Sequence, residues 1–477
     1  MRIATTSRRD TPATLHQRCC AGQWRMHSTP NAPSSSSRHR TPLVAPLSLA
    51  TLVAAMALAG CASAPASESL PDRLAKPQPT ALAPAANSAQ VSAPVGTAAE
   101  VPPEEGFDAW RTAFSKQALA AGIEPQTVRE VLGSAQWQPR VVELDRAQPE
   151  FTRTPWAYLD SAVSPQRIAQ GQAMRAQHHA ALDAAATRHG VPAAVITAIW
   201  GMESNYGSNF GTYRAVDALA TLAYDGRRRA WAQAELLAAL RIVDQGDIPA
   251  DRMVGSWAGA MGHTQFLPSV FLAYAVDADG DGHRDIWGSI ADVTASTAHF
   301  LARMGWKSGQ TWGVEVQLPA GFDYARAEIS TRQNSAAWAA EGVRTLDGQP
   351  MPEVGAASII TPAGARGPAF LVGTNFRTIL RYNNSVNYAL GVGLLARQID
   401  GGPPVATAWP RDIAPLNRDQ LRQLQEALNA KGFDAGVPDG VMGPATRAGL
   451  RRFQQSIGTV ADGYPTHALL ERLQAPR

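Results

Sequence analysis

The distribution of cysteine most constrains how this 477-residue chain can fold. Its three cysteines are Cys19, Cys20 and Cys61, so residues 62–477 contain none. That part of the chain therefore has no disulfide, no cysteine-ligated zinc site and no cysteine nucleophile. Because 45% of all residues are hydrophobic, a sizeable apolar core can stabilise the chain instead, and a wholly disordered or collagen-like chain is excluded.

The first sixty residues have the composition of a secretory leader. Residues 1–40 are rich in arginine, and residues 43–59 form a short uncharged block of mainly Ala and Leu, which is typical of a signal peptide. The sequence Leu58-Ala59-Gly60-Cys61 resembles a bacterial lipobox, whose cysteine is diacylated and becomes the mature N-terminus. The resemblance implies a periplasmic lipoprotein anchored to the outer membrane through Cys61. An ordinary signal peptide with an incidental Cys61 is the alternative.

The basic character of the chain, a formal net charge of +3, comes from this leader. Residues 1–60 contain seven Arg and one Asp, so residues 61–477 carry a net charge of about −3. No basic stripe interleaved with aromatic residues marks a nucleic-acid-binding surface. We therefore expect no nucleic-acid partner.

Two further changes in composition divide the rest of the chain, whose length suggests about three domains. Residues 62–104 contain eight prolines and no aromatic residue, which predicts an unstructured tether. A second break begins at Gly401-Gly402-Pro403-Pro404. The expected organisation is a leader over 1–60, a tether over 61–104, a body over 105–400, a linker over 401–415 and a C-terminal module over 416–477.

The body has mostly helical periodicity. Apolar residues recur with helical spacing over Phe107–Ala121, Ile168–Arg188 and Trp231–Val243. Short strand signals occur near Gly313–Leu318 and Phe370–Val372. The pattern predicts a mainly α fold with a minor β-sheet.

One carboxylate lies on the apolar face of a predicted helix. Val195, Ile196 and Ile199 form that face, and Glu203 continues it one turn later. Burial among apolar side chains raises the pKa of a carboxyl group, and an acid that stays protonated near neutral pH can protonate a glycosidic oxygen. On spacing alone, the alternative is a helix-terminal Glu203 that turns into solvent or pairs with an arginine.

Several sequence blocks follow one another between residues 105 and 400. They are Glu203-Ser204-Asn205-Tyr206-Gly207, Leu219-Ala220-Thr221-Leu222, Arg228-Arg229, Gly259-Ala260-Met261-Gly262-His263-Thr264-Gln265-Phe266-Leu267-Pro268, the Asp277–His283 loop, Asn375-Phe376 and Arg381-Tyr382-Asn383-Asn384-Ser385. In this order they resemble the membrane-bound lytic murein transglycosylase B family. The resemblance implies a lysozyme-like, mainly α catalytic domain that cleaves the MurNAc–GlcNAc β-1,4 bond of peptidoglycan strands.

The resemblance also implies the mechanism. Glu203 would protonate the leaving oxygen and then deprotonate the C6 hydroxyl of MurNAc, which closes a 1,6-anhydro ring without any cofactor. This scheme departs from the usual pair of carboxylates. The sequence leaves open whether Asp217 or Asp225 approaches as a second acid. A goose-type lysozyme-like muramidase and a catalytically silent peptidoglycan-binding lipoprotein remain the alternatives.

The family resemblance further implies a set of glycan-binding residues. Gln265 carries an amide that can both donate to and accept from an acetamido group. Each of these residues could instead have a structural role, as an aromatic side chain in the core or as a charged side chain in solvent. Arg227 occupies the position where the family often has a proline, which leaves the alignment of residues 227–229 with the family's arginine pair open. The implied glycan contacts are Ser256, Gln265, Tyr382, Asn383 and Tyr388, with Arg228 and Arg229 near the glycan or its stem peptides.

The loop that begins at Asp277 matches the start of an EF-hand. Its oxygen ligands at positions 1, 3 and 5, its glycine at position 6 and a backbone carbonyl at position 7 suit a hard cation such as Ca²⁺. Position 12 is Gly288 instead of glutamate, and the family resemblance supplies a later acid. A structural Ca²⁺ is expected, with an ion-free Asp/Gly turn as the alternative. The expected ligands are Asp277, Asp279, Asp281, His283 through its carbonyl, and Asp292.

The C-terminal module resembles the small three-helix peptidoglycan-binding domain. Asn417–Lys431 has the pattern of an amphipathic helix, and Asp439-Gly440 and Gly443-Pro444 supply turn chemistry before the next one. Leu450 and Phe453 are expected in its core. A second wall-binding site on a tether would raise the effective concentration of the enzyme on its polymer.

Overall fold

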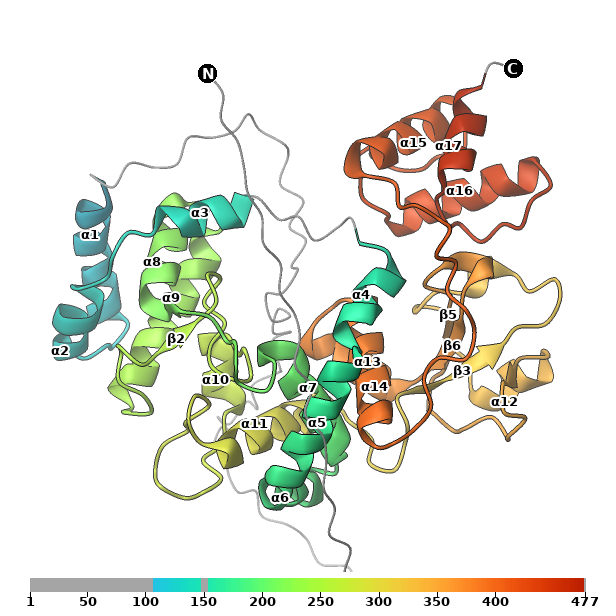
Figure 1. Cartoon of the computed structure of the whole chain (residues 1–477). Coiled ribbons are helices and arrows are strands. Elements are labelled where there is room, and N and C mark those ends of the chain that lie inside the picture. The colour runs from blue at the N-terminus through green and yellow to red at the C-terminus, as the bar shows by residue number, and fades with distance from the viewer. Residues whose placement is uncertain (1–105, 147–152, 476–477) are drawn as a thin grey trace, which may run out of the picture. The chain divides into compact units, whose positions relative to one another are not determined.

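A computed structural model describes residues 106–146 and 153–475 (Figure 1). The leader over 1–60, the tether over 61–104 and Cys61 lie outside the described residues, and what the sequence indicates for them stays a prediction. Within the described ranges, none of the helices is long and apolar enough to cross a membrane.

Helices form most of the body, as predicted. They are α1 (Phe107–Ala120), α2 (Pro125–Thr127), the π-helical η2 (Val128–Leu132), α3 (Pro139–Arg146), α4 (Pro155–Ala162), α5 (Pro165–Gln177), α6 (His179–His189), α7 (Ala193–Ser204), α8 (Ala215–Asp225), α9 (Arg229–Asp244), α10 (Pro268–Tyr274), α11 (Ile290–Arg303), the 3-10 turn η4 (Tyr324–Arg326), α12 (Ser335–Ala340), the 3-10 turn η5 (Gly364–Arg366), α13 (Thr374–Tyr382) and α14 (Val386–Ile399).

The helix predicted over Ile168–Arg188 is in fact two helices, α5 and α6. His178 interrupts them with a non-helical backbone (φ −110°, ψ 26°). Its imidazole lies edge-on to Trp200, with 5.6 Å between ring centroids. Apolar spacing continues across the break because both helices face the same core, so the sequence pattern does not reveal it.

Two small antiparallel sheets accompany the helices. One pairs β1 (Tyr213–Arg214) with β2 (Val254–Gly255). The other has the strand order β4-β3-β6-β5, formed by Arg344–Thr345, Gly313–Gln317, Ala369–Val372 and Ser358–Ile360. The two segments predicted as strands are therefore the central pair, with Val314 opposite Leu371.

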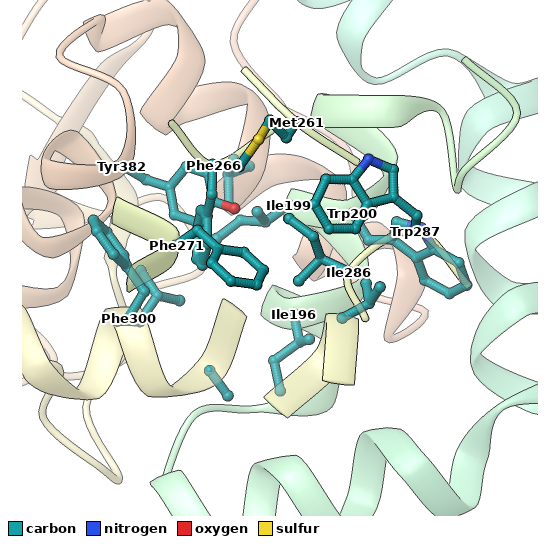
Figure 2. Packing of buried hydrophobic residues seen from close by; sticks show 14 of the residues in the cluster. Ile196, Ile199, Trp200, Met261, Phe266, Phe271, Ile286, Trp287, Phe300 and Tyr382 are labelled. Carbon is teal, nitrogen blue, oxygen red and sulfur yellow. The ribbon is translucent and has the colours of Figure 1, made fainter. Parts of the chain in front are cut away.

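Helix α7 lies at the centre of the body. Every residue from Ala193 to Gly201 is buried, and α5, α6, α11 and α14 all pack against the helix. Figure 2 shows Ile196, Ile199 and Trp200 of this helix among buried side chains of later segments. Packing on all sides fixes the last turn of α7, which carries Glu203.

The C-terminal module consists of α15 (Arg418–Ala430), α16 (Pro444–Ser456) and α17 (His467–Gln474), which enclose a separate hydrophobic cluster. Leu450 and Phe453 are buried there, as expected. Asn417 begins α15 with a capping box to Gln420.

The linker before this module is fixed to the body and does not act as a free tether. Its backbone amides at Ala406 and Thr407 each donate to the buried Glu315 carboxylate at 2.8 Å. Arg411 forms two hydrogen bonds to Asp160. The linker carries no helix or strand of its own, so its sequence composition alone could not show these attachments.

Candidate active site

The turn after α7 sets the position of Glu203. Asn205, Tyr206 and Gly207 all have left-handed backbones, with φ of 49°, 59° and 82°. The Ser204 hydroxyl accepts the Gly207 N–H at 3.0 Å, and the Tyr206 hydroxyl donates to the Arg167 carbonyl at 2.8 Å. Left-handed non-glycine residues are strained and persist where the surroundings hold them, often at functional sites.

Gly207 is required because His263 leaves no space for a side chain. A Cβ at Gly207 would lie 2.2 Å from Cε1 of that imidazole. His263 stacks on Trp200 and accepts its indole N–H at Nδ1, 3.1 Å away. The imidazole thus links the α7 end to the loop over residues 259–268.

The Glu203 carboxylate faces a buried tyrosine. The Tyr388 hydroxyl, from the first turn of α14, donates to Glu203 Oε1 at 2.5 Å. Burial raises the pKa of Glu203 to about 7, while the hydrogen bond from Tyr388 acts in the opposite direction. At neutral pH a large fraction of this carboxyl group is therefore protonated.

Tyr382 lies close enough to Glu203 and Tyr388 to interact electrostatically with both, and Gln265 follows the residue that Tyr382 contacts. The Tyr382 hydroxyl donates to the Thr264 carbonyl at 2.6 Å, and its ring packs on Phe266 and Phe300 (Figure 2). Gln265 has a left-handed backbone (φ 51°), and its side-chain N–H group donates to the carbonyls of Phe210 and Gly262. The donor side of this amide is thus used within the protein, which leaves its oxygen to accept a bond from a ligand.

Ser256 and Asn383 differ in how their side chains are used. The Ser256 hydroxyl accepts the Ala260 N–H at 3.1 Å and closes the turn that leads to the 259–268 loop. Asn383 follows α13, and its side-chain oxygen is buried without a hydrogen-bond partner among the described residues. An unsatisfied acceptor of this kind is available for a ligand N–H or O–H group.

Neither candidate second acid is free to act with Glu203. Asp217 accepts a hydrogen bond from Gln136 N–H at 3.2 Å and pairs with Arg214. Asp225 pairs with Arg146 at 2.8 Å. Both carboxylates are therefore engaged with arginines.

The arginines that the family resemblance places near the glycan have mixed surroundings. Arg227 and Arg228 both pair with the buried carboxylate of Asp145, at 2.5 and 2.7 Å. The Arg228 guanidinium also lies over Trp231 and Trp257, 4.5 and 5.8 Å from their ring centroids. Arg229 is exposed and has no ion pair within the ranges that the structure describes.

Three carboxylates of the EF-hand-like loop converge. Oxygens of Asp277, Asp279 and Asp292 lie within 4.8 Å of one another, whereas Asp281 lies outside this group and caps the His283 N–H at 2.8 Å. Burial raises the pKa of Asp292 to about 6, and hydrogen bonds from two backbone N–H groups oppose the shift. None of these three carboxylates pairs with a Lys or Arg within the described ranges, and such a group of oxygen donors fits a hard ion such as Ca²⁺.

Two features of the site were not identified from the sequence. One is Asp145, which holds both arginines; nothing in the local sequence marks it, since it comes from α3. The other is the hydrogen bond between Tyr388 and Glu203, which joins residues 185 positions apart. Tyr388 itself was predicted to line the sugar site, but its contact with the acid depends on how α14 packs on α7.

Two family models match this chain. The transglycosylase SLT domain matches residues 106–397, and a peptidoglycan binding domain matches residues 417–473. Membrane-bound lytic murein transglycosylase B of Escherichia coli K12 is 32% identical over 295 residues, which cover 58% of this chain and 79% of the relative.

Solved structures are similar as well. SltB3 from Pseudomonas aeruginosa, in complex with NAG-anhNAM-pentapeptide, is 53% identical with a TM-score of 0.75, and the match covers 77% of this chain and 99% of that one. Slt35 of Escherichia coli, in complex with calcium, is 29% identical with a TM-score of 0.53 and coverages of 61% and 92%. The mainly α, lysozyme-like fold with a helical C-terminal module is thereby confirmed.

Proposed function

The chain belongs to the transglycosylase SLT family, and from this premise we propose that Glu203 is the single catalytic acid and base of a peptidoglycan lytic transglycosylase. The enzyme class follows from the family, and the resemblance to the lytic murein transglycosylase B family is confirmed. The assignment to Glu203 depends on one observation above all, a carboxyl group with a pKa of about 7 at the end of a fully packed helix.

The proposed reaction uses the two protonation states of Glu203 in turn. The protonated carboxyl group donates its proton to the glycosidic oxygen between MurNAc and GlcNAc as that bond breaks. The resulting carboxylate then takes the proton of the MurNAc C6 hydroxyl, whose oxygen attacks C1 and closes the 1,6-anhydro ring. Tyr388 stabilises the intervening carboxylate by its hydrogen bond at 2.5 Å. A pKa near the working pH suits a group that must serve as both acid and base.

The engagement of Asp217 and Asp225 with arginines supports a one-carboxylate mechanism. A hydrolase of the usual two-carboxylate kind needs a second acidic residue near the sugar, either as the nucleophile or as the base that activates water. The C6 hydroxyl of the substrate makes such a base unnecessary, because the nucleophile is part of the sugar itself.

Residues beside Glu203 are proposed to bind the glycan. The Gln265 side-chain oxygen and the unpartnered Asn383 oxygen supply acceptors for acetamido and hydroxyl groups. Tyr382 holds the Thr264–Gln265 turn in place, and Ser256 shapes the preceding loop. Arg228, flanked by Trp257, is proposed to contact the glycan or its stem peptide, together with the exposed Arg229.

A structural Ca²⁺ is proposed at Asp277, Asp279 and Asp292. The three carboxylates gather their negative charge in one place, which costs free energy unless a cation is bound. Slt35, a relative by structure, has been solved in complex with calcium. We propose that Asp281 and the His283 carbonyl complete the set of ligands from the same loop. The ion would stabilise the loop and would take no part in bond cleavage.

We further propose that the enzyme is a periplasmic lipoprotein of the outer membrane, acylated at Cys61. The lipobox-like sequence supports this proposal, as does the membrane-bound character of the Escherichia coli relative. Cells grown with an alkyne analogue of palmitate should label the wild-type protein and leave Cys61→Ser unlabelled. Equal labelling of the two proteins, or none, would contradict the anchor.

Products of sacculus digestion test the reaction itself. Mass spectrometry should detect MurNAc ends that are lighter by one water than reducing ends, because the anhydro ring forms without hydrolysis. Glu203→Gln should yield no such ends. Reducing MurNAc ends would indicate a muramidase instead, and an inactive wild type with intact wall binding would indicate a silent binding protein.

A further inference from the structure

A cavity of about 390 Å³ lies where the C-terminal module meets the body. Body residues on one side of it come from the start of α4, the segment around β5 and the start of α14, and module residues from α15, α16 and the loop before α17 complete it. The volume falls within the range of small-molecule and short-peptide sites, which occur preferentially at domain interfaces.

Charged and polar contacts hold the two walls of this cavity together. Arg447 and Arg451 of α16 both pair with Glu328 of the body, at 3.1 and 3.2 Å. The Asp462 carboxylate accepts the N–H of Ala365 at 2.9 Å. The walls are thus joined by direct contacts, in addition to the linker bonds to Glu315.

Several polar side chains that line the cavity have no partner among the residues that the structure describes. Asn387 and Thr361 make no side-chain hydrogen bond, and neither does the Tyr464 hydroxyl, among the residues described. Arg153 forms no ion pair over the same ranges. The cavity therefore offers a cation, amide and hydroxyl groups beside apolar side chains such as Ile360 and Leu421.

The cavity and the catalytic acid share one helix start. Val386 and Asn387 line the cavity, and the next residue along α14, Tyr388, donates to Glu203. A ligand in the cavity thus lies beside the turn that positions the acid.

We infer that this cavity binds the peptide stem of the strand being cleaved, an inference that rests on the proposed function. The stem is a short peptide with free carboxylates, secondary amides and small apolar side chains, and it is joined to the MurNAc residue whose bond is cut. Arg153 would pair with a carboxylate, Asn387 and Tyr464 with amide groups, and the apolar side chains with alanine methyl groups. A further saccharide fits less well, because Tyr464 is the one aromatic ring that lines the cavity.

The test compares two substrates on the full-length protein. One is glycan that retains its stems, and the other is the same glycan after an amidase has removed them. The quantity of interest is the ratio of kcat/KM for the first to kcat/KM for the second. Arg153→Ala should lower this ratio by about tenfold, the loss expected for one charge-assisted hydrogen bond, and Tyr464→Phe should lower it by a smaller factor. Arg422→Ala, which removes an exposed guanidinium paired with Asp419 on the module, should leave the ratio at the wild-type value.

A binding measurement separates this inference from the proposed reaction. Calorimetry with the free tetrapeptide L-Ala-γ-D-Glu-meso-diaminopimelate-D-Ala should detect binding to Glu203→Gln and weaker binding once Arg153→Ala is added. Unchanged ratios in both cavity variants would overturn the inference, and so would an equal loss on both substrates, which would indicate a saccharide site. Tetrapeptide binding together with an absence of anhydro products would refute the proposed function and leave the peptide site standing.

Discussion

Replacing Tyr388 by Phe tests whether the buried hydrogen bond sets the proton affinity of the catalytic acid. The change removes one hydroxyl and keeps the ring, which is 4% exposed and packed in the core. Tyr388 donates to Glu203 and so stabilises its charged form. Without that bond, burial acts unopposed, and the pKa of Glu203 should rise above its present value of about 7.

The size of the rise follows from the energy of the bond. A hydrogen bond to a charged group contributes about 1.5–3 kcal/mol, and one pKa unit corresponds to about 1.4 kcal/mol. Part of this energy is also present when the carboxyl group is protonated, so we expect a rise of about one unit. The protonated fraction at pH 8 would then change from about one tenth to about one half.

The pH dependence of kcat/KM on isolated glycan strands reports this change, since it follows the protonation of the free enzyme. The wild type should lose activity as pH rises through about 7, and its rate at pH 8 should be about a tenth of that at pH 6. In Tyr388→Phe the same quotient should be about one half, whatever the absolute rate. Tyr382→Phe is the matched control, because that hydroxyl donates to the Thr264 carbonyl and not to Glu203.

An alkaline limb that stays in place in Tyr388→Phe, or moves to lower pH, would refute this reasoning. An equal displacement in Tyr382→Phe would also refute it, since the effect would then come from general disturbance of the core. Both variants should unfold at similar temperatures, so that the comparison concerns the acid alone.

Three further predictions concern stability. The folded-state pKa of Glu203 is raised, so the contribution of this group to stability is present below pH 4.5 and is lost as pH rises through about 7. Urea unfolding at pH 8 should therefore show Glu203→Gln to be the more stable protein, by up to about 3 kcal/mol. A stability difference that does not change with pH would contradict this prediction. Chelation by EDTA should lower the Tm of the wild type, because removal of a ligand present at a hundredfold excess over its Kd costs about 2.7 kcal/mol of stability. The double variant Asp277→Asn/Asp279→Asn should not respond to EDTA, because it lacks two of the proposed ligands. A response in both proteins would exclude this loop as the calcium site. Gly207→Ala should lower the free energy of unfolding by at least about 1–3 kcal/mol, since this glycine has a φ of 82° and a Cβ there would lie 2.2 Å from His263. Gly458→Ala is the control, because Gly458 is also left-handed but lies in open space, and its free energy of unfolding should fall by less.

Much of the fold could be predicted because the relevant signals are local. The helical spacing, the two central strands and the turn chemistry of the C-terminal module each depend on residues close together in the chain. The break at His178 could not be predicted, because the apolar period continues across it and the contact with Trp200 comes from the tertiary structure. The candidate acid could be predicted for the same local reason, since Glu203 interrupts an apolar face.

The surroundings of that acid could be predicted only in part. The family resemblance supplied Tyr388 and Gln265 as candidates, but the direction of their hydrogen bonds depends on the packing of α14 and the 259–268 loop. The arginine pair was expected at the substrate, and the buried Asp145 that holds Arg227 and Arg228 comes from a distant helix. In the calcium loop, the 1-3-5 spacing indicated three aspartates, and the structure brings Asp292 to the group in place of Asp281.

The cysteine distribution and the apolar periodicity were enough to predict that residues 62–477 are stabilised by the packing of mainly helical elements, with an acid on the apolar face of one helix. Both are properties of composition and spacing, and they depend only on residues that lie close together in the chain. Three outcomes could be seen only in the folded chain: which hydroxyl faces that acid, which aspartates meet at the loop, and that the C-terminal module is held against the body. These outcomes depend on contacts between residues far apart in the chain, and such contacts form only when whole helices pack together.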